Sequence, residues 1–370
     1  MIIDDNFVLW KIDDSDIKFG KCIIPYGVKE IQSRVFADKS NIQEIILPDS
    51  LTTIGGQAFH GCKNLKEIKV PYSVKKIGPG AFSQSGVAKV SLPVCMEKIS
   101  NSLFDKCTEL ESIVLPHGLT SIGIQAFGGC SKLTDVYVPD SVTNIGDSAF
   151  ANCKSLVSVK LPNDLKVLPQ YIFSGCQALS RVDMPDTLQS IKTGAFTNCT
   201  SLNTMCLPHT LRTIHPYAFE RCSKLASVTF PQKDTPLDIG AYAFAYSGIK
   251  EVNIPNASVM VHEFAFKNCE NLEQVSIPNP DVEIINQAFS NCCSLQRVAV
   301  SESAQIGSYV FYYTPKTCKI ETIKDENKKS YNPAGFELFE KIINEHKLAK
   351  ENNENNDISI STNDFDVEER

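Results

Sequence analysis

The residues of this sequence best able to do chemistry are its fourteen cysteines, whose thiols can form disulfides, hold metal ions or attack as nucleophiles. Nine of them recur at one position of a repeating pattern: Cys62, Cys107, Cys130, Cys153, Cys176, Cys199, Cys222, Cys269 and Cys292. No two cysteines have the C-x-x-C spacing of zinc or redox sites. The pattern favours a ladder of buried, reduced thiols, with disulfides or a metal site as the alternatives.

Other catalytic patterns are incomplete. His262-Glu263 lacks the second histidine of a zinc-protease motif, and Gly78-Pro79-Gly80 lacks the third glycine of a dinucleotide fingerprint. No Walker loop or nucleophile elbow is present, and the six histidines fall at different repeat positions. The sequence therefore predicts a protein that is not an enzyme and that holds neither cofactor nor metal.

The elements that carry these residues follow from one unit, Ser141–Pro162 (SVTNIGDSAFANCKSLVSVKLP). Residues 156–161 end in strict alternation of apolar and polar side chains, which predicts a short strand with one buried face, and Pro162 ends it. Gly146 permits a bend. Residues 149–153 suggest a short helical or 3₁₀ turn.

Near-copies of this unit fill most of the chain with a period of 23 residues, marked by a proline that closes each strand. The prolines are Pro25, Pro48, Pro71, Pro93, Pro116, Pro139, Pro162, Pro185, Pro208, Pro231, Pro255 and Pro278. So short a unit cannot bury its own apolar residues, and stacked copies with strands paired in parallel at about 4.8 Å can. The predicted structural ladder is Phe59, Phe82, Phe127, Phe150, Phe173, Phe196 and Phe219 with Cys130, Cys153 and Cys176, and further phenylalanines continue it as Phe36, Phe104, Phe244, Phe266, Phe289 and Phe311.

The pattern L-x-x-V-x-L-P-x-x-V-x-x-I-x-x-x-A-F-x-x-C resembles the BspA-type (treponemal-type) leucine-rich repeat over residues 21–314. The resemblance implies a β-rich α/β fold, a right-handed leucine-rich-repeat solenoid of short parallel strands, turns and short helical turns. Members of this family are largely surface or secreted proteins that attach to host or matrix proteins, so no catalytic residue carries over. Ser85-Gly86 and Ser247-Gly248 replace the cysteine turn in two units.

We expect four parts along the chain. Residues 1–20 form an N-terminal cap, in which Phe7, Leu9, Trp10 and Ile12 make a hairpin over the first repeat, because an open solenoid end exposes apolar surface and unpaired backbone. Residues 21–314 form about 12–13 repeats, and an inserted residue near 233–236 bulges outward. Residues 315–349 form a C-terminal helical cap, or alternatively a partner-binding helix, and residues 350–370 a disordered acidic tail.

The net charge of −7 is uneven along the chain. Residues 351–370 hold seven acids and one base, which leaves 35 bases and 36 acids in residues 1–350. A nearly neutral solenoid does not favour nucleic acid, and we expect no membrane insertion because no stretch is long and apolar enough. The N-terminus does not resemble a signal peptide. We therefore expect a cytoplasmic monomer with a protein partner, with export to the cell surface as the alternative.

Outward strand residues stack from repeat to repeat into two columns, and repeat proteins use such a face for binding. Most of these residues are small and polar. The exceptions combine apolar, aromatic and charged groups, which are favoured in protein interfaces: Val114, Tyr137, Lys160, Arg181 and Asp183. These residues predict a protein-binding scaffold. A surface adhesin is the second interpretation, and a carbohydrate-binding module or enzyme, which an exposed aromatic row would favour, is the third.

Overall fold

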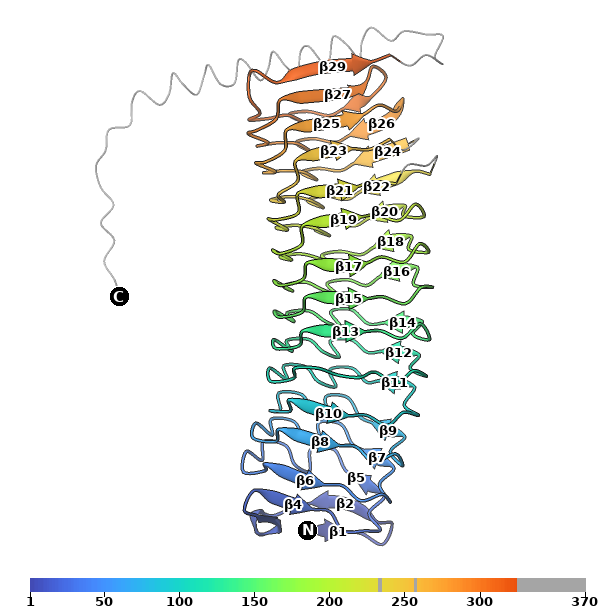
Figure 1. Ribbon diagram of the computed structural model, residues 1–370, viewed down its shortest axis with the longest axis vertical. Coiled ribbons are helices and arrows are strands. Elements are labelled where there is room, and N and C mark those ends of the chain that lie inside the picture. Colours follow the sequence, from blue (N-terminus) through green and yellow to red (C-terminus); the bar gives the residue numbers. More distant parts are fainter. Residues whose placement is uncertain (232–234, 256–257, 325–370) are drawn as a thin grey trace, which may run out of the picture.

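The chain winds into a single long stack of coils, seen from the side in the ribbon of Figure 1. This computed structural model describes residues 1–231, 235–255 and 258–324. The predicted C-terminal helix beyond residue 324, the acidic tail and residues 233–234 of the insertion near 233–236 lie outside these residues. Most coils contribute two short strands, and equivalent strands lie above one another, so parallel pairing runs along two sides of the stack.

The first strands of the coils form the sheet labelled along the middle of Figure 1. They are β3 (Ile17–Lys18), β4 (Lys21–Ile23), β6 (Glu44–Ile46), β8 (Glu67–Lys69), β10 (Lys89–Ser91), β13 (Asp135–Tyr137), β15 (Ser158–Lys160), β17 (Arg181–Asp183), β19 (Thr204–Cys206), β21 (Ser227–Thr229), β23 (Glu251–Asn253), β25 (Gln274–Ile277), β27 (Arg297–Ser301) and β29 (Lys319–Ile323). We call the outer surface of this sheet the strand face.

The second strands follow the proline turns. They are β1 (Ile2–Ile3), β2 (Val8–Lys11), β5 (Glu30–Ile31), β7 (Thr53–Ile54), β9 (Lys76–Ile77), β11 (Lys98–Ile99), β12 (Ser121–Ile122), β14 (Asn144–Ile145), β16 (Val167–Leu168), β18 (Ser190–Ile191), β20 (Thr213–Ile214), β22 (Leu237–Ile239), β24 (Ser258–Val261), β26 (Asp281–Ile284) and β28 (Gln305–Ile306). Within the described residues the only helix is η1, a 3₁₀ turn at Asp14–Asp16.

The strand register confirms the predicted alternation. Val159 pairs with Val182 in the next coil and is buried, while its neighbours Ser158 and Lys160 are exposed. A step of one period keeps every buried residue over its equivalent, because the side chains of parallel, in-register strands point the same way. The two columns of outward residues therefore lie on the strand face as predicted.

The turns that carry the phenylalanines are hydrogen-bonded but not helical. Ser148 and Asn152 have φ angles of 57° and 58°, in the left-handed region. Left-handed residues within the turn prevent a right-handed helix from continuing. The turn is instead bonded to the next coil: the N–H of Phe150 donates to the carbonyl of Ile172 at 3.0 Å. Ser148 and Asn152 donate in the same way at 2.8 and 2.7 Å. These bonds join the coils on the side that has no strand.

Close backbone approach explains the glycine that follows the second strand. A Cβ atom on Gly146 would lie 2.4 Å from the backbone nitrogen of Ile124 in the preceding coil. Gly78 and Gly123 meet the same obstacle, at 2.4 and 2.5 Å. The sequence suggested that Gly146 permits a bend, and the structure shows that it admits the neighbouring coil.

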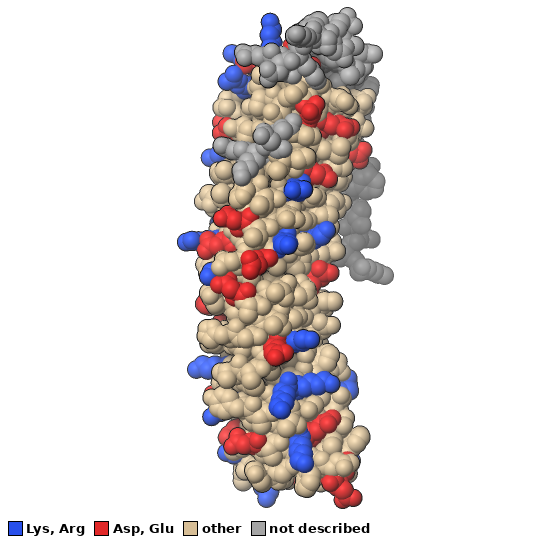
Figure 2. Space-filling model, turned by 90° about the vertical axis from the view of Figure 1, so that its right-hand side faces the viewer, with Lys and Arg blue, Asp and Glu red and all other residues tan. Residues whose placement is uncertain are grey.

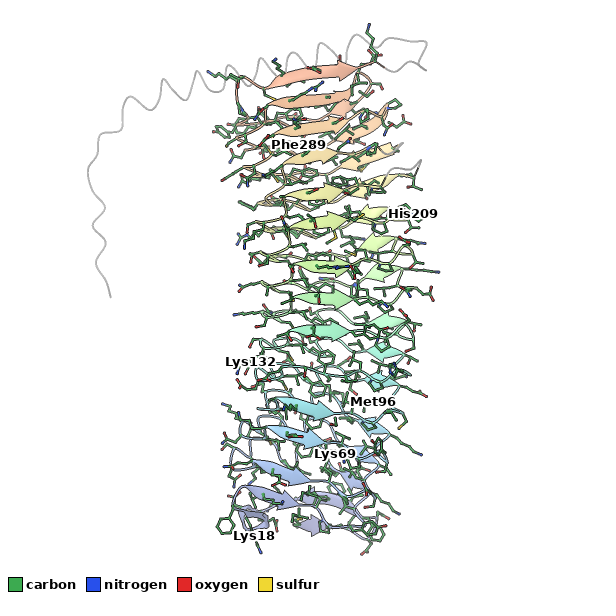
Figure 3. All side chains as sticks on the ribbon, viewed as in Figure 1. Lys18, Lys69, Met96, Lys132, His209 and Phe289 are labelled. Atoms are coloured by element: carbon green, nitrogen blue, oxygen red, sulfur yellow. The ribbon has the colours of Figure 1, made fainter. Side chains whose placement is uncertain are left out.

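The core is a column of phenylalanine rings. All thirteen predicted rings, from Phe36 to Phe311, stack in one series, with successive centroids 4.9–5.9 Å apart. In Figure 3, Phe289 lies within the stack, whereas Lys132 and His209, in two different turns, lie at opposite edges. Each coil therefore buries its ring against the rings of the coils above and below it.

Both ends differ from a plain coil. At the N-terminus β1 pairs antiparallel with β2, and β3 pairs antiparallel with β4, so two hairpins begin the sheets. Leu9 and Ile12 are buried there, while Phe7 and Trp10 are exposed. At the other end β29 pairs in parallel with β27. The sheet therefore continues beyond residue 314, where we expected the repeats to stop, since backbone pairing does not require the L-x-x-V-x-L-P pattern.

Candidate interaction surfaces

The repeat cysteines are enclosed and chemically quiet. All fourteen cysteines are free, and the nine repeat cysteines are buried. Each of these nine thiols donates to the carbonyl of a phenylalanine in the preceding coil, at 2.9–3.3 Å. Burial raises the pKa of the Cys62, Cys107 and Cys176 thiols to about 12, so they stay protonated at neutral pH. The nine repeat thiols therefore lie in a ladder of buried groups, each hydrogen-bonded to the preceding coil.

The two histidines with charged neighbours in the described ranges contact an acid and a lysine. His262 Nε2 lies 2.9 Å from Asp238 Oδ1, and Lys192 Nζ lies 3.2 Å from His215 Nε2. Burial and the nearby Lys192 charge lower the pKa of His215. Across the described ranges no group of three or more His, Cys, Asp or Glu side chains could hold a metal ion.

The predicted patch is largely assembled on the strand face. Tyr137, Lys160 and Asp183 occupy the same position in β13, β15 and β17, which pair in register. Lys160 Nζ lies 5.0 Å from the centroid of the Tyr137 ring, within cation–π range. The Tyr137 side chain is 51% exposed, so this pair presents its outer surface to solvent.

Arg181 stands beside this column at the start of β17. Its Nε lies 2.9 Å from Asp183 Oδ1, and both side chains are exposed. Val114 is 83% exposed but belongs to a coil whose residues 112–114 form no strand. Four of the five predicted residues therefore form two contacts, the Tyr137–Lys160 cation–π pair and the Arg181–Asp183 ion pair. Val114 is a separate apolar side chain.

Shallow hollows interrupt the strand face outside this patch. One, of about 440 Å³, lies over β6 and β8 and is lined by Ile46, Lys69 and three acids, Glu44, Asp49 and Glu67. A second, of about 320 Å³, lies over β21 and β23. Both hollows are open to solvent, and the charged side chains that line them are exposed.

An aromatic row, which the strand columns lacked, lies instead on the turns, with Tyr217 exposed and Tyr242 and Phe264 half-buried. Tyr217, Tyr242 and Phe264 stack, with successive ring centroids 5.2 and 4.8 Å apart. Tyr246 lies in the same turn as Tyr242, four residues later. Tyr217, Tyr242 and Phe264 each stand directly before an Ala-Phe pair, and Tyr246 stands four residues after Tyr242. An aromatic residue at either of these repeat positions was the signal available in the sequence. We define the turn strip by three positions in each of seven coils: the residue two before the stacked phenylalanine, and the residues one and two after it. These residues are 171, 174–175, 194, 197–198, 217, 220–221, 242, 245–246, 264, 267–268, 287, 290–291, 309 and 312–313.

One long side of the stack shows no extended field of one sign. Figure 2 shows lysines, arginines and acids scattered over one long side of the stack, with broad uncharged areas between them. Such a side does not favour a polyanion such as nucleic acid. Over the described part of the chain, no helix has the length and apolar character needed to cross a membrane.

Comparison with known proteins agrees with this architecture. The profile of the BspA type leucine rich repeat region, with 6 copies, matches residues 29–157, 143–259 and 237–350. A leucine-rich repeat protein from Bacteroides ovatus is 29% identical, with a TM-score of 0.55, over 75% of this chain and 67% of that one. The leucine-rich repeat protein of T. pallidum is 30% identical, with a TM-score of 0.36, over 49% of this chain and 77% of that one.

No protein of curated function matches the chain. The profile matches span most of the sequence and coincide with the coils that carry the phenylalanine and cysteine ladders. On these grounds the chain belongs to the BspA-type leucine-rich repeat family.

Proposed function

We propose that this protein is a non-catalytic scaffold that binds a protein partner through the strand face. The observation that carries the proposal is the pairing of Tyr137 with Lys160, beside Arg181 and Asp183, on an exposed and regular sheet. Tyrosine and arginine are enriched among the residues that dominate protein interfaces. Leucine-rich-repeat solenoids are generally non-catalytic, and their long surfaces suit extended contacts.

The charged side chains of the patch contact neighbours within the chain itself. The ring holds the Lys160 ammonium group, and the Asp183 carboxylate holds the Arg181 guanidinium group. A partner would therefore immobilise few free side chains, which lowers the entropic cost of binding. Val114, exposed in the adjoining coil, adds an apolar contact at the edge.

The experiment is a pull-down from native cells with the purified chain, followed by identification and titration of the captured protein. Tyr137→Ala and Arg181→Ala should each weaken capture about tenfold or more, as hot-spot truncations do. Tyr72→Ala is the matched control, because Tyr72 is an exposed tyrosine in a proline turn and not on the strand face. Equal capture by both patch variants would reject this site.

We place the scaffold in the cytoplasm, and the fourteen free thiols support that choice, because reducing compartments preserve such thiols. The alternative is an adhesin of the same fold at the cell surface. Fractionation of native cells with an antibody against the chain separates the two. Protein on the outer surface, together with oxidised cysteines in a titration under denaturing conditions, would favour the adhesin.

A further inference from the structure

The turn strip carries bulky residues where the backbone favours small ones. Tyr217, Tyr242, Phe264 and Tyr246 have φ angles of 57–61°, a region that costs conformational energy for residues with a large side chain. Glycine takes one of these positions in other coils, for example Gly80. The equivalent positions also have positive φ in the other coils, for example Gln57, Gln125 and Ser148, so the aromatic side chains, and not the backbone, distinguish these coils.

These aromatic side chains are already ordered. The stacked rings restrain one another, Arg221 lies 5.6 Å from the centroid of Tyr246, and Lys267 Nζ lies 4.8 Å from that of Phe264. Little side-chain entropy remains to be lost when a partner covers them. The stacked faces are hidden within the row, so edges and hydroxyl groups are what a partner would meet. That arrangement suits an apolar protein surface better than a sugar ring stacked on an aromatic face.

The strip is nearly symmetric about the coil of Tyr242. One coil away on either side stand two aromatic residues, Tyr217 and Phe264, and three coils away stand two tyrosines, Tyr171 and Tyr309. Two coils away stand Gly194 and Gln287, a small residue and a long one. A two-fold axis across the stack at this coil therefore sets the aromatic residues of one copy opposite aromatic residues of the other.

The charges of the strip are arranged in the same way, but with opposite sign. Glu220, Ala245 and Lys267 occupy one turn position in three consecutive coils. A two-fold axis across the stack at Ala245 brings Glu220 of one copy opposite Lys267 of the other, and this occurs twice. The Glu220 side chain is 20% accessible, and its ion pair with Arg221 Nε is long, at 3.8 Å. Arg221 would meet the neutral Asn268 of the second copy, so no like charges oppose.

We propose that a second copy of this chain docks on the turn strip, antiparallel to the first, about a two-fold axis at the coil of Tyr242 and Ala245. The strip spans seven coils, roughly 30 Å at the spacing of paired strands. Contact along so narrow a strip would bury on the order of 1,000 Å² in total, at the low end for specific interfaces. The dimer is therefore weak and reversible, and it replaces the monomer expected from sequence. It leaves the strand face free for another partner.

Sedimentation velocity of the full chain, from low micromolar to submillimolar concentration, tests the proposal. The unmodified chain should shift reversibly from monomer to dimer. Glu220→Lys sets two lysines opposite each other, and Lys267→Glu sets two glutamates opposite each other, so each should raise the dissociation constant about tenfold or more. The double variant exchanges the two charges and should return the constant to within about threefold of the original.

Lys89→Glu is the matched control, because it makes the same charge change on the strand face, in β10, and should leave dimerisation unchanged. An unchanged thermal unfolding midpoint for each variant verifies that it is folded. A chain that stays monomeric throughout the range would overturn the proposal. A dimer insensitive to both single reversals, or one that the double variant fails to restore, would also overturn it.

Discussion

The thiol of Cys153 donates a hydrogen bond to the carbonyl of Phe127, 26 residues earlier, at 3.2 Å. The same bond recurs at all nine repeat cysteines, so each thiol anchors the turn that holds the ring of the preceding coil. A thiol suits this position because it is small and apolar and yet donates weakly. Coil-to-coil coupling therefore combines stacked rings, backbone bonds and a thiol bond in one column.

Truncation of a central ring should be among the most costly substitutions in the protein. Phe150 is fully buried between Phe127 and Phe173, with centroids 5.3 and 5.9 Å away. Phe150→Ala should lower the free energy of unfolding by about 3–5 kcal/mol, measured by urea denaturation. Tyr72→Ala, at an exposed ring, should change it by less than about 0.5 kcal/mol. A loss below about 1 kcal/mol for Phe150→Ala would contradict a rigid ring column.

The buried thiols should make the protein sensitive to alkali. An unfolded cysteine ionises near pH 8.5, whereas burial raises the folded pKa of Cys62, Cys107 and Cys176 to about 12. The unfolded state therefore releases protons first as the pH rises. Stability is fully present below about pH 8.5 and falls between there and pH 12, by about 1.4 kcal/mol per pH unit for each such thiol.

Urea midpoints measured from pH 7 to pH 11 would reveal this dependence of stability on pH. Cys176→Ala removes one buried thiol, so it should reduce the slope by the contribution of that thiol. In the native state a thiol reagent at neutral pH should modify the exposed Cys95, Cys206 and Cys293 rapidly. The repeat cysteines should react only after denaturation. Rapid native modification of the repeat thiols would show that the coils open readily.

Two glycines give a direct test of coil-to-coil contact. Gly146→Ala would place a Cβ atom 2.4 Å from the Ile124 nitrogen, so the neighbouring backbone must move and stability should fall by about 2 kcal/mol or more. Gly118→Ala meets nothing within 4 Å and should be neutral or stabilise by up to about 1 kcal/mol. Thermal unfolding of the pair checks this, and equal effects would refute the close approach.

Substitutions in the strand-face patch should affect binding without affecting folding. The Arg181–Asp183 ion pair is exposed, with side chains 76% and 57% accessible, and such pairs contribute about 0–1 kcal/mol. Arg181→Ala should therefore keep the unfolding free energy within about 0.5 kcal/mol while it weakens partner capture. A large loss of stability would mean that Arg181 supports the sheet, and its effect on capture could then not be assigned to contact.

The repeat could be predicted in detail from sequence because every coil must satisfy the same packing rule. A ring, a thiol and alternating strand residues recur with the period, and stacking the coils in register buries them all. The turns in which Ser-Gly replaces the cysteine could also be found in the sequence, but the physical reason for the replacement could not. Ser85-Gly86 occurs as a pair because a Cβ on Gly86 would lie 1.9 Å from the carbonyl oxygen of Lys63, so the altered turn requires glycine beside the serine.

The surface was only partly predictable. The strand columns follow from alternation, so Tyr137, Lys160 and Asp183 could be placed together in advance. Their contacts could not, because the cation–π pair and the Arg181–Asp183 ion pair depend on rotamers. The turn was expected to be helical, and its left-handed residues could not be inferred because they depend on bonds to the next coil.

By itself the sequence determined the repeat, its buried ladders and the face made by its strands, since these depend on period and residue type alone. Only the tertiary structure decided that Tyr217, Tyr242 and Phe264 form an outward row, and that Glu220 and Lys267 flank it. These residues are separated by whole coils in the chain. They become neighbours because winding converts a period in sequence into a short distance along the stack.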